Sequence, residues 1–259
     1  MGSDETPVFY EDFPVLEAVW GEGFLSPGGV DEVARIVGDA DLSGAKVLDV
    51  GCGAGGATIA LLEEHGAAEV VGIDPMDHLI DYCRTRSQRL GLADRAHYQL
   101  MPVAGALDFP DESFDAVFSK DSLLHAADKE AAFTELGRIL RPEGRLLIGD
   151  WFRGAGHHLD AEVEALSEGM WTMVTLDDTV ALVERCGFIV DDAIDRQPWY
   201  AEMVVAERDR FDSDWGRTFV EQFGQESFDN LRHEWVDFAA AAQSGALSPG
   251  HLRATKSSV

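Results

Sequence analysis

The hydrophobic and polar positions of the chain follow two alternating patterns. Short runs rich in Val, Ile and Leu are typical of buried strands, and apolar residues at about every third or fourth position are typical of amphipathic helices. The predicted strands cover 47–50, 70–73, 96–100, 116–119, 145–150 and 188–194. The predicted helices between them cover 58–65, 79–90, 130–140 and 179–186. This alternation predicts a doubly wound α/β fold, with parallel strands joined by right-handed crossovers and helices on both faces.

Both ends of the chain depart from this alternation. The remaining segments with helical spacing are 13–20, 30–37, 200–223 and 228–242. A turn rich in Gly, Pro and Ser at 21–29 separates the first two. We expect the last two to cover the sheet, and 251–256 to form a short strand at the edge of the sheet.

These elements predict one domain in three parts. Residues 1–44 hold the N-terminal helices, residues 45–195 the α/β core, and residues 196–259 the helical cover and the last strand. A chain of 259 residues can bury a substantial core and is somewhat longer than a usual single domain. One elaborated domain is therefore the preferred interpretation.

The charge of the chain limits its partners. There are 48 Asp and Glu against 20 Lys and Arg, which gives a formal net charge of −28. Such an excess repels nucleic acid and anionic membranes, so we expect neither as a partner. We expect a monomer or homodimer that acts on a small molecule. Because a surface poor in lysine and rich in carboxylates stays hydrated at high salt, we also expect halophilic adaptation.

Cysteines and histidines show no ligand spacing. The cysteines are odd in number and form no C-x-x-C motif, so neither a disulfide framework nor a metal site is expected: Cys52, Cys83 and Cys186. The pair His157-His158 lies in a glycine-rich loop where adjacent side chains diverge, which favours a solvent loop. Residues 1–10 are polar and acidic, and no run of about 18 apolar residues occurs. These features predict a cytoplasmic protein without a membrane span.

The clearest local motif is 47–56, V-L-D-V-G-C-G-A-G-G, in which a predicted strand runs into a glycine-rich turn and a helix. Glycines let the backbone approach a ligand closely, and the helix N-terminus offers unpaired N–H groups. The spacing of the glycines departs from the G-x-G-x-x-G motif of dinucleotide-binding sites. The negative charge of Asp49 would repel a pyrophosphate, but it suits the ammonium and sulfonium of S-adenosylmethionine. Asp74, at the end of the next strand, can accept hydrogen bonds from both ribose hydroxyls. For the glycines alone, an ordinary strand-to-helix turn is the alternative.

These residues resemble motifs I and II of the class I S-adenosylmethionine-dependent methyltransferases. The resemblance extends to 107–117 (L-D-F-P-D-E-S-F-D-A-V), which runs into the fourth strand, and to 140–148 (L-R-P-E-G-R-L-L-I), before the fifth. It implies a Rossmann-like methyltransferase fold with a mainly parallel seven-stranded sheet, and S-adenosylmethionine as the cofactor. The residues that it assigns to the cofactor are Asp49, Gly51, Cys52, Gly53, Gly55, Asp74, Pro75, Val103, Ala104 and Ser119. Where the family often has an acid facing the adenine amino group, this chain has V-A-G at 103–105, so backbone groups or apolar packing would recognise adenine.

The acceptor site is predicted next to the fourth strand. Residues 118–125 (F-S-K-D-S-L-L-H) follow that strand at the carboxyl edge of the sheet, where ligands bind in this architecture. Asp121 and His125 are four positions apart, so on a helical turn they share one face and can address one small substrate. His125 can take up a proton, and Asp121 can hold a cationic amine. For either residue alone, a structural role at the surface is the alternative.

Three segments resemble the phosphoethanolamine N-methyltransferases and their small-amine relatives. They are 20–29 (W-G-E-G-F-L-S-P-G-G), 119–125 (S-K-D-S-L-L-H) and 253–256 (R-A-T-K). The resemblance implies that the N-terminal helices form a lid, with Ser26 in the loop over the ligands. It also implies that His125 is the catalytic histidine and Asp121 the active-site acid, and it indicates methyl transfer to an amine nitrogen.

Departures from that family bear on the acceptor. The family pairs its histidine with an N-terminal tyrosine, whose aligned position here is Val8, so Tyr10 is the candidate for that role. The family's tyrosines and arginine that hold a substrate phosphate fall near Phe152, Gly169 and Trp171. Without those donors we expect an unphosphorylated amine of the ethanolamine or glycine type.

Tryptophans are the candidates for substrate contacts, namely Trp20, Trp151 and Trp171. The rings of Trp151, Trp171 and Trp199 can attract a methylated ammonium by cation–π interaction, worth about 0.5 to 2 kcal/mol per ring. Core packing is the alternative for each ring.

Two other functions stay open. The same fold serves oxygen, sulfur or carbon acceptors equally well, because function depends on the site rather than the fold. A module that binds S-adenosylmethionine without chemistry belongs to a different class. Such a binder would not need Asp121 and His125, so the sequence favours an enzyme.

Overall fold

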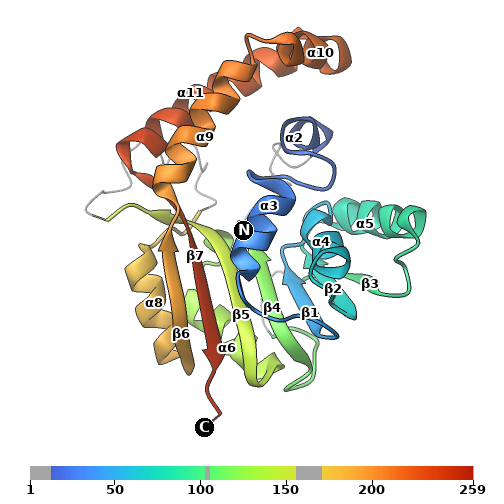
Figure 1. The fold of residues 1–259 in the computed structure, drawn as a ribbon, viewed down its shortest axis with the longest axis vertical. Coiled ribbons are helices and arrows are strands. Elements are labelled where there is room, and N and C mark those ends of the chain that lie inside the picture. Colours follow the sequence, from blue (N-terminus) through green and yellow to red (C-terminus); the bar gives the residue numbers. More distant parts are fainter. Residues whose placement is uncertain (1–12, 103–105, 156–170, 259) are drawn as a thin grey trace, which may run out of the picture.

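The computed structural model describes residues 13–102, 106–155 and 171–258. Within these ranges the strands form one seven-stranded sheet with the order β3-β2-β1-β4-β5-β7-β6 (Figure 1). The strands are β1 (Lys46–Val50), β2 (Glu69–Asp74), β3 (Ala96–Leu100), β4 (Phe114–Lys120), β5 (Leu140–Arg153), β6 (Phe188–Asp195) and β7 (Leu247–Lys256). Strands β1 to β5 pair in parallel, while β7 runs antiparallel to β5 and β6. The predicted doubly wound, mainly parallel fold is confirmed.

The last strand lies inside the sheet, between β5 and β6. The prediction of an edge strand at 251–256 is therefore wrong, and β6 is the edge strand at that end. His251 and Arg253, which make the segment poor in apolar residues, both have partners far away in sequence. His251 Nε2 lies 2.7 Å from Glu32 Oε1, and Arg253 Nη1 lies 2.5 Å from Asp192 Oδ2. These partners make the two polar residues compatible with a central strand.

Two layers of helices cover the faces of the sheet (Figure 1). On one face lie α3 (Gly29–Val37), α4 (Gly56–Glu63) and α5 (Asp77–Leu90), and on the other lie α6 (Lys129–Ile139) and α8 (Leu176–Arg185). Because successive side chains of a strand point to opposite faces, β1 contributes to both layers. Val47 joins the hydrophobic core of the first layer and Leu48 that of the second.

The C-terminal helices extend from the carboxyl edge of the sheet rather than lying over a face (Figure 1). They are α9 (Gln197–Arg210), α10 (Asp214–Phe223) and α11 (Gln225–Ser244). The single helix predicted at 200–223 is interrupted at Ser213, whose hydroxyl accepts a hydrogen bond from the Trp215 N–H at the start of α10. Apolar side chains of these helices pack with Val15 and Val19 of α2 (Phe13–Trp20) in a separate hydrophobic cluster, so the expected cover lies beyond the strand ends. No helix in the described part of the chain is long and apolar enough to span a bilayer.

Candidate active site

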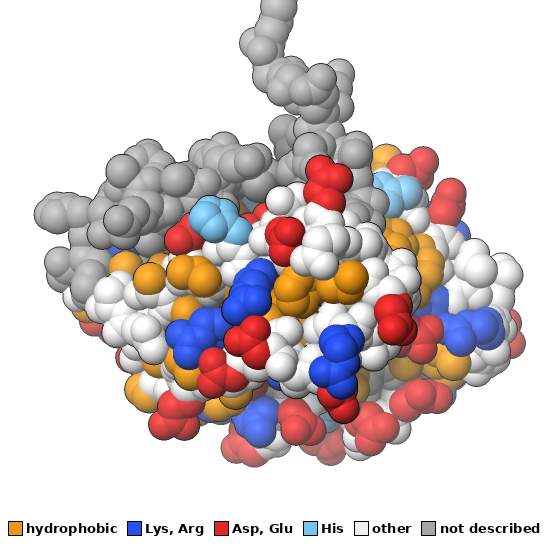
Figure 2. Space-filling view, turned by 90° about the horizontal axis from the view of Figure 1, so that it is seen from above, with side chains coloured by type: hydrophobic (Ala, Val, Ile, Leu, Met, Phe, Trp, Pro, Cys, Tyr) orange, Lys and Arg blue, Asp and Glu red, His pale blue; other side chains and the backbone are white. Residues whose placement is uncertain are grey.

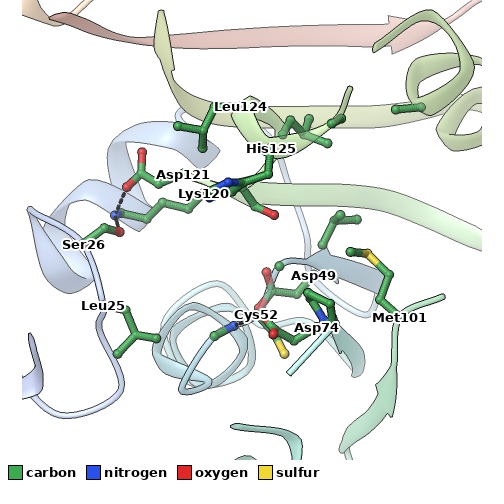
Figure 3. A pocket seen from close by; sticks show the side chains of 18 of the residues that line it. Leu25, Ser26, Asp49, Cys52, Asp74, Met101, Lys120, Asp121, Leu124 and His125 are labelled. Atoms are coloured by element: carbon green, nitrogen blue, oxygen red, sulfur yellow. Dashed lines mark hydrogen bonds and ion pairs between the residues drawn. The ribbon is translucent and has the colours of Figure 1, made fainter. Parts of the chain in front are cut away.

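A cavity of about 1450 Å³ lies at the carboxyl ends of β1, β2 and β4. Its walls come from the turn after β1, the end of β2, the segment after β4, the loop after α2 and the C-terminal helices. Figure 2 looks onto this end of the molecule, where apolar side chains lie at the centre of the face and charged side chains surround them. In Figure 3, Asp49 and Asp74 lie on one side of the cavity, and Lys120, Asp121 and His125 on the other. The predicted cofactor and acceptor groups thus face one cavity from two sides.

The glycine turn brings two segments into close contact. Gly51 has a φ of 72°, in the left-handed region, and its N–H donates to Ile73 O at 2.8 Å. A Cβ atom at this position would overlap the side chain of Ser122, in the segment after β4. Glycine therefore lets the turn after β1 approach the segment after β4.

Asp74 is positioned by backbone N–H groups at the end of β2. Its Oδ2 accepts from Gly53 N at 3.0 Å and its Oδ1 from Met76 N at 2.9 Å. Burial raises the pKa of Asp74, whereas these hydrogen bonds lower it. A carboxylate has about four acceptor sites, so each oxygen can still accept a ribose hydroxyl.

Asp49 lies deeper, 1% exposed, and its Oδ2 accepts from Thr58 Oγ1 at 2.6 Å. Burial raises the pKa of Asp49 to about 7; the hydrogen bond from Thr58 opposes this, and the charge of Asp74 adds to it. A cation beside Asp49 would stabilise its ionised form. Two carboxylates around a glycine turn fit the hydroxyls, ammonium and sulfonium of S-adenosylmethionine, and do not fit a pyrophosphate.

Lys120 is a cavity residue that the sequence analysis passed over. Its ammonium lies 2.5 Å from both Ser26 Oγ and Asp121 Oδ2 (Figure 3). It therefore joins the predicted lid loop to the predicted acceptor acid, and can also attract a ligand carboxylate. The sequence did hold a sign of this role. Lys120 is one of only four lysines in the chain, and it stands between two predicted site residues, Ser119 and Asp121.

The segment after β4 is not the expected helical turn. Asp121 adopts a φ of 53°, and its N–H donates to Gly149 O at 2.8 Å. The following residues form a short 3₁₀ helix, η1 (Leu123–His125). Asp121 and His125 still line the same cavity. A non-glycine residue in this left-handed region is strained, a feature that clusters at functional sites.

Asp150, near the end of β5, is a second residue that the sequence analysis missed. It is 5% exposed, and its Oδ1 accepts from Trp151 N at 2.9 Å. Burial, and after it the charge of Asp121, raise the pKa of Asp150 to about 8, against the opposite effect of Lys129. A protonated Asp150 at neutral pH adds no second negative charge beside the ion pair of Asp121 and Lys120.

The other predicted cofactor residues are placed as follows. Ser26, Cys52, Gly53 and Pro75 line the cavity. Ser119 does not, because its hydroxyl donates to Val50 O at 3.0 Å, so the expected cofactor contact of its side chain is not supported. Gly55 is the residue before α4, with a φ of 81°, and is not among the residues that line the cavity. Tyr10, Val103, Ala104 and the pair His157-His158 lie outside the described residues.

Aromatic residues form the part of the cavity wall beyond Asp121. The predicted Trp20, Trp151 and Trp171 line it, together with three residues that were not predicted: Tyr200, Trp235 and Phe238. Trp199 is not in this wall, since its ring packs against the Arg196 guanidinium at 4.3 Å. Phe152 is buried in the protein, 4% exposed.

Comparison with known proteins agrees with this geometry. Residues 48–148 match the family model described as a methyltransferase domain. The chain is 30% identical to phosphoethanolamine N-methyltransferase 1 of Arabidopsis thaliana, over 85% of this chain and 44% of that protein. It is 24% identical to the phosphoethanolamine N-methyltransferase of Plasmodium falciparum, over 95% of this chain and 92% of that protein. A solved structure of phosphoethanolamine N-methyltransferase 2 of Haemonchus contortus, in complex with phosphomonomethylethanolamine and S-adenosylhomocysteine, matches with a TM-score of 0.86 and 26% identity, over 96% of this chain and 57% of that one.

Residues 48–148 form a class I methyltransferase domain. The predicted resemblance to the phosphoethanolamine N-methyltransferases is confirmed, and with it a methyltransferase domain that uses S-adenosylmethionine. The chain spans about half the length of the first curated relatives it matches.

Proposed function

We propose that this protein transfers the methyl group of S-adenosylmethionine to the nitrogen of an unphosphorylated amine. The observation that carries the proposal is the two-sided cavity, with Asp49 and Asp74 facing Asp121 and His125. When bound, the cofactor supplies an electrophilic methyl group on a sulfonium. Ethanolamine- and glycine-type amines are the simplest members of this acceptor class.

The lack of a phosphate clamp supports an unphosphorylated acceptor. Among the described residues that line the cavity, Lys120 is the only lysine or arginine, and it already pairs with Asp121. The residues outside the described ranges contain no lysine or arginine, so they add no permanently charged side chain that could bind a phosphate. A buried phosphate without cationic partners would lose its hydration uncompensated.

The proposed roles of the acceptor-side residues follow from their chemistry. Asp121 holds the ammonium of the acceptor, and His125 takes its proton so that the nitrogen lone pair becomes available. The lone pair forms the new nitrogen–carbon bond as the sulfur–carbon bond breaks, leaving a neutral thioether. Walls that exclude water and fix the line of attack supply the remaining catalysis. Tyr10 is proposed as a partner of His125 on the strength of the resemblance alone.

A panel of acceptors tests the proposal. The full chain is incubated with methyl-labelled S-adenosylmethionine and with ethanolamine, phosphoethanolamine, glycine, a thiol or a phenol. We expect label in the amines, and phosphoethanolamine well below its unphosphorylated counterpart. Transfer to the thiol or the phenol alone would replace the amine by a sulfur or oxygen acceptor. Binding of the cofactor without transfer to any acceptor would favour the non-enzymatic module.

A further inference from the structure

The aromatic wall of the cavity is built from rings of several elements. We define the aromatic compartment as Trp20, Trp151, Trp171, Tyr200, Trp235 and Phe238. The ring centroids of Trp20 and Trp235 are 5.3 Å apart, and Phe238 lies 6.3 Å from both Trp235 and Trp171. Trp151 and Tyr200 meet edge to face at 4.6 Å. Such spacings are those of packed aromatic rings, so the wall presents a largely apolar surface to a ligand.

One carboxylate accepts hydrogen bonds from two of these aromatic side chains. Glu207 of α9 accepts hydrogen bonds from Trp20 Nε1 at 3.0 Å and from Trp235 Nε1 at 3.3 Å. One indole comes from α2 and the other from α11, so Glu207 ties the N-terminal helix to the C-terminal helices. Burial, and then the charges of Glu207 and Asp121, raise the pKa of Tyr200, because both carboxylates lie close to this residue.

The cavity as a whole is larger than a two-carbon amine needs. Cavities of roughly 300 to 1000 Å³ bury a drug-sized ligand. The cavity here measures about 1450 Å³, which leaves space beside the cofactor for an acceptor well above the size of ethanolamine. An apolar wall of this extent gains free energy only from a ligand that covers it.

We propose that the amine acceptor carries an alkyl or aryl body, which the aromatic compartment binds while Asp121 faces its ammonium. This inference rests on the proposed amine methylation and adds the chemical class of the rest of the substrate. Glu207 acts as a positioning residue, because it bonds to the rings rather than to the acceptor. Phe238, at the junction of Trp171 and Trp235, is the ring that we assign to the acceptor body.

A graded series of n-alkylamines tests the apolar body. Calorimetry measures their binding to the protein saturated with S-adenosylhomocysteine, and methyl transfer is measured in parallel. Each added methylene should lower Kd about two- to fourfold until the compartment is filled. The n-alkanols of equal length serve as neutral controls and should bind more weakly than the amines. A Kd that does not change with chain length overturns the inference.

Variants locate the binding. Phe238→Ala should flatten the dependence of Kd on chain length, while the matched control Val236→Ala, at an exposed position of the same helix, should not. Glu207→Gln should weaken the binding of long amines more than that of ethanolamine, with Glu202→Gln on the exposed side of α9 as its control. An equal loss for both amines would assign Glu207 a purely structural role.

The two proposals fail separately. If ethanolamine is methylated as well as any longer amine, the inference fails and amine methylation stands. If no amine is methylated although the cofactor binds, amine methylation fails, and the inference falls with it.

Discussion

Gly51 faces Ser122 so closely that a Cβ atom on Gly51 would overlap the Cβ and Oγ atoms of Ser122. This contact joins the turn after β1 to the segment after β4, and so joins the cofactor side of the cavity to the acceptor side. The position of Asp121, one residue before Ser122, depends on how closely these two segments approach.

Gly51→Ala should lower both thermal stability and cofactor affinity. The substitution forces an alanine into a left-handed conformation, which costs about 1 to 2 kcal/mol, and adds the overlap with Ser122. Ser122→Gly removes the overlap but not the backbone strain, so the double variant should regain part of the loss. Calorimetry and melting temperatures measure the four proteins of this cycle. Additive effects of the two substitutions would contradict the contact.

Asp49 should give the cofactor affinity a pH dependence. Its pKa is raised from 3.8 to about 7 in the folded protein, so between these values the folded state holds a proton that the unfolded chain releases. Stability therefore falls as pH rises through this window. A cationic cofactor favours the ionised carboxylate, so its affinity should rise with pH, by at most about tenfold per unit, and level off above about pH 7.

Asp150 and Glu207 could also cause a pH dependence in this range, because their pKa values are raised to about 8 and about 7, mainly by burial. The Asp49→Asn variant separates the effect of Asp49 from theirs. Its cofactor affinity should be weaker above pH 7 and should change less between about pH 6 and about pH 8 than that of the wild type. An unchanged pH profile would show that another group titrates.

The net charge of −28 should make stability dependent on salt. Self-repulsion destabilises the compact state, and salt screens it. The melting temperature should rise by about 5 °C or more between about 0.1 M and about 2 M KCl. Sucrose is the control, because it stabilises proteins without screening charge. A melting temperature that is insensitive to KCl would contradict the expected salt adaptation.

The sequence predicts the sheet well where strands are continuous apolar runs. Val47 and Leu48 are both fully buried, as expected for a parallel strand covered on two faces. For β7 it predicts a strand but the wrong place in the sheet, because the partners of His251 and Arg253 lie in α3 and β6, and such long-range pairs leave no local pattern.

The candidate site shows the same division. The cofactor turn could be predicted because its conformation depends on local glycines. The aromatic compartment could be predicted only in part, through Trp20, Trp151 and Trp171. Tyr200, Trp235 and Phe238 belong to helices whose sequence gives no sign of a ligand, and only the packing of α9 and α11 beyond the strand ends brings them to the cavity. Lys120 was missed because its role depends on Ser26, a residue of a distant loop.

Asp121 and His125 should affect different kinetic constants. If the acceptor is an ammonium, His125 must take its proton before the lone pair can attack, and general bases contribute typically about 10² to 10⁴-fold. His125→Ala should therefore lower kcat within that range and leave cofactor affinity nearly unchanged. Asp121→Asn should instead raise the KM of the acceptor, since it removes the charge that attracts the ammonium.

The φ of 53° at Asp121 makes asparagine the right replacement, because Asn accepts the left-handed region far better than Ala does. Asp121→Asn thus tests the charge with the backbone kept, and Asp121→Ala, which adds strain, should also lower the melting temperature. Steady-state kinetics across pH, with labelled cofactor, separates the two roles. If His125→Ala keeps a kcat near that of the wild type at every pH, solvent or another group such as Tyr10 removes the proton. If Asp121→Asn leaves the KM unchanged, the ammonium is held elsewhere, and the aromatic compartment alone would have to supply the attraction.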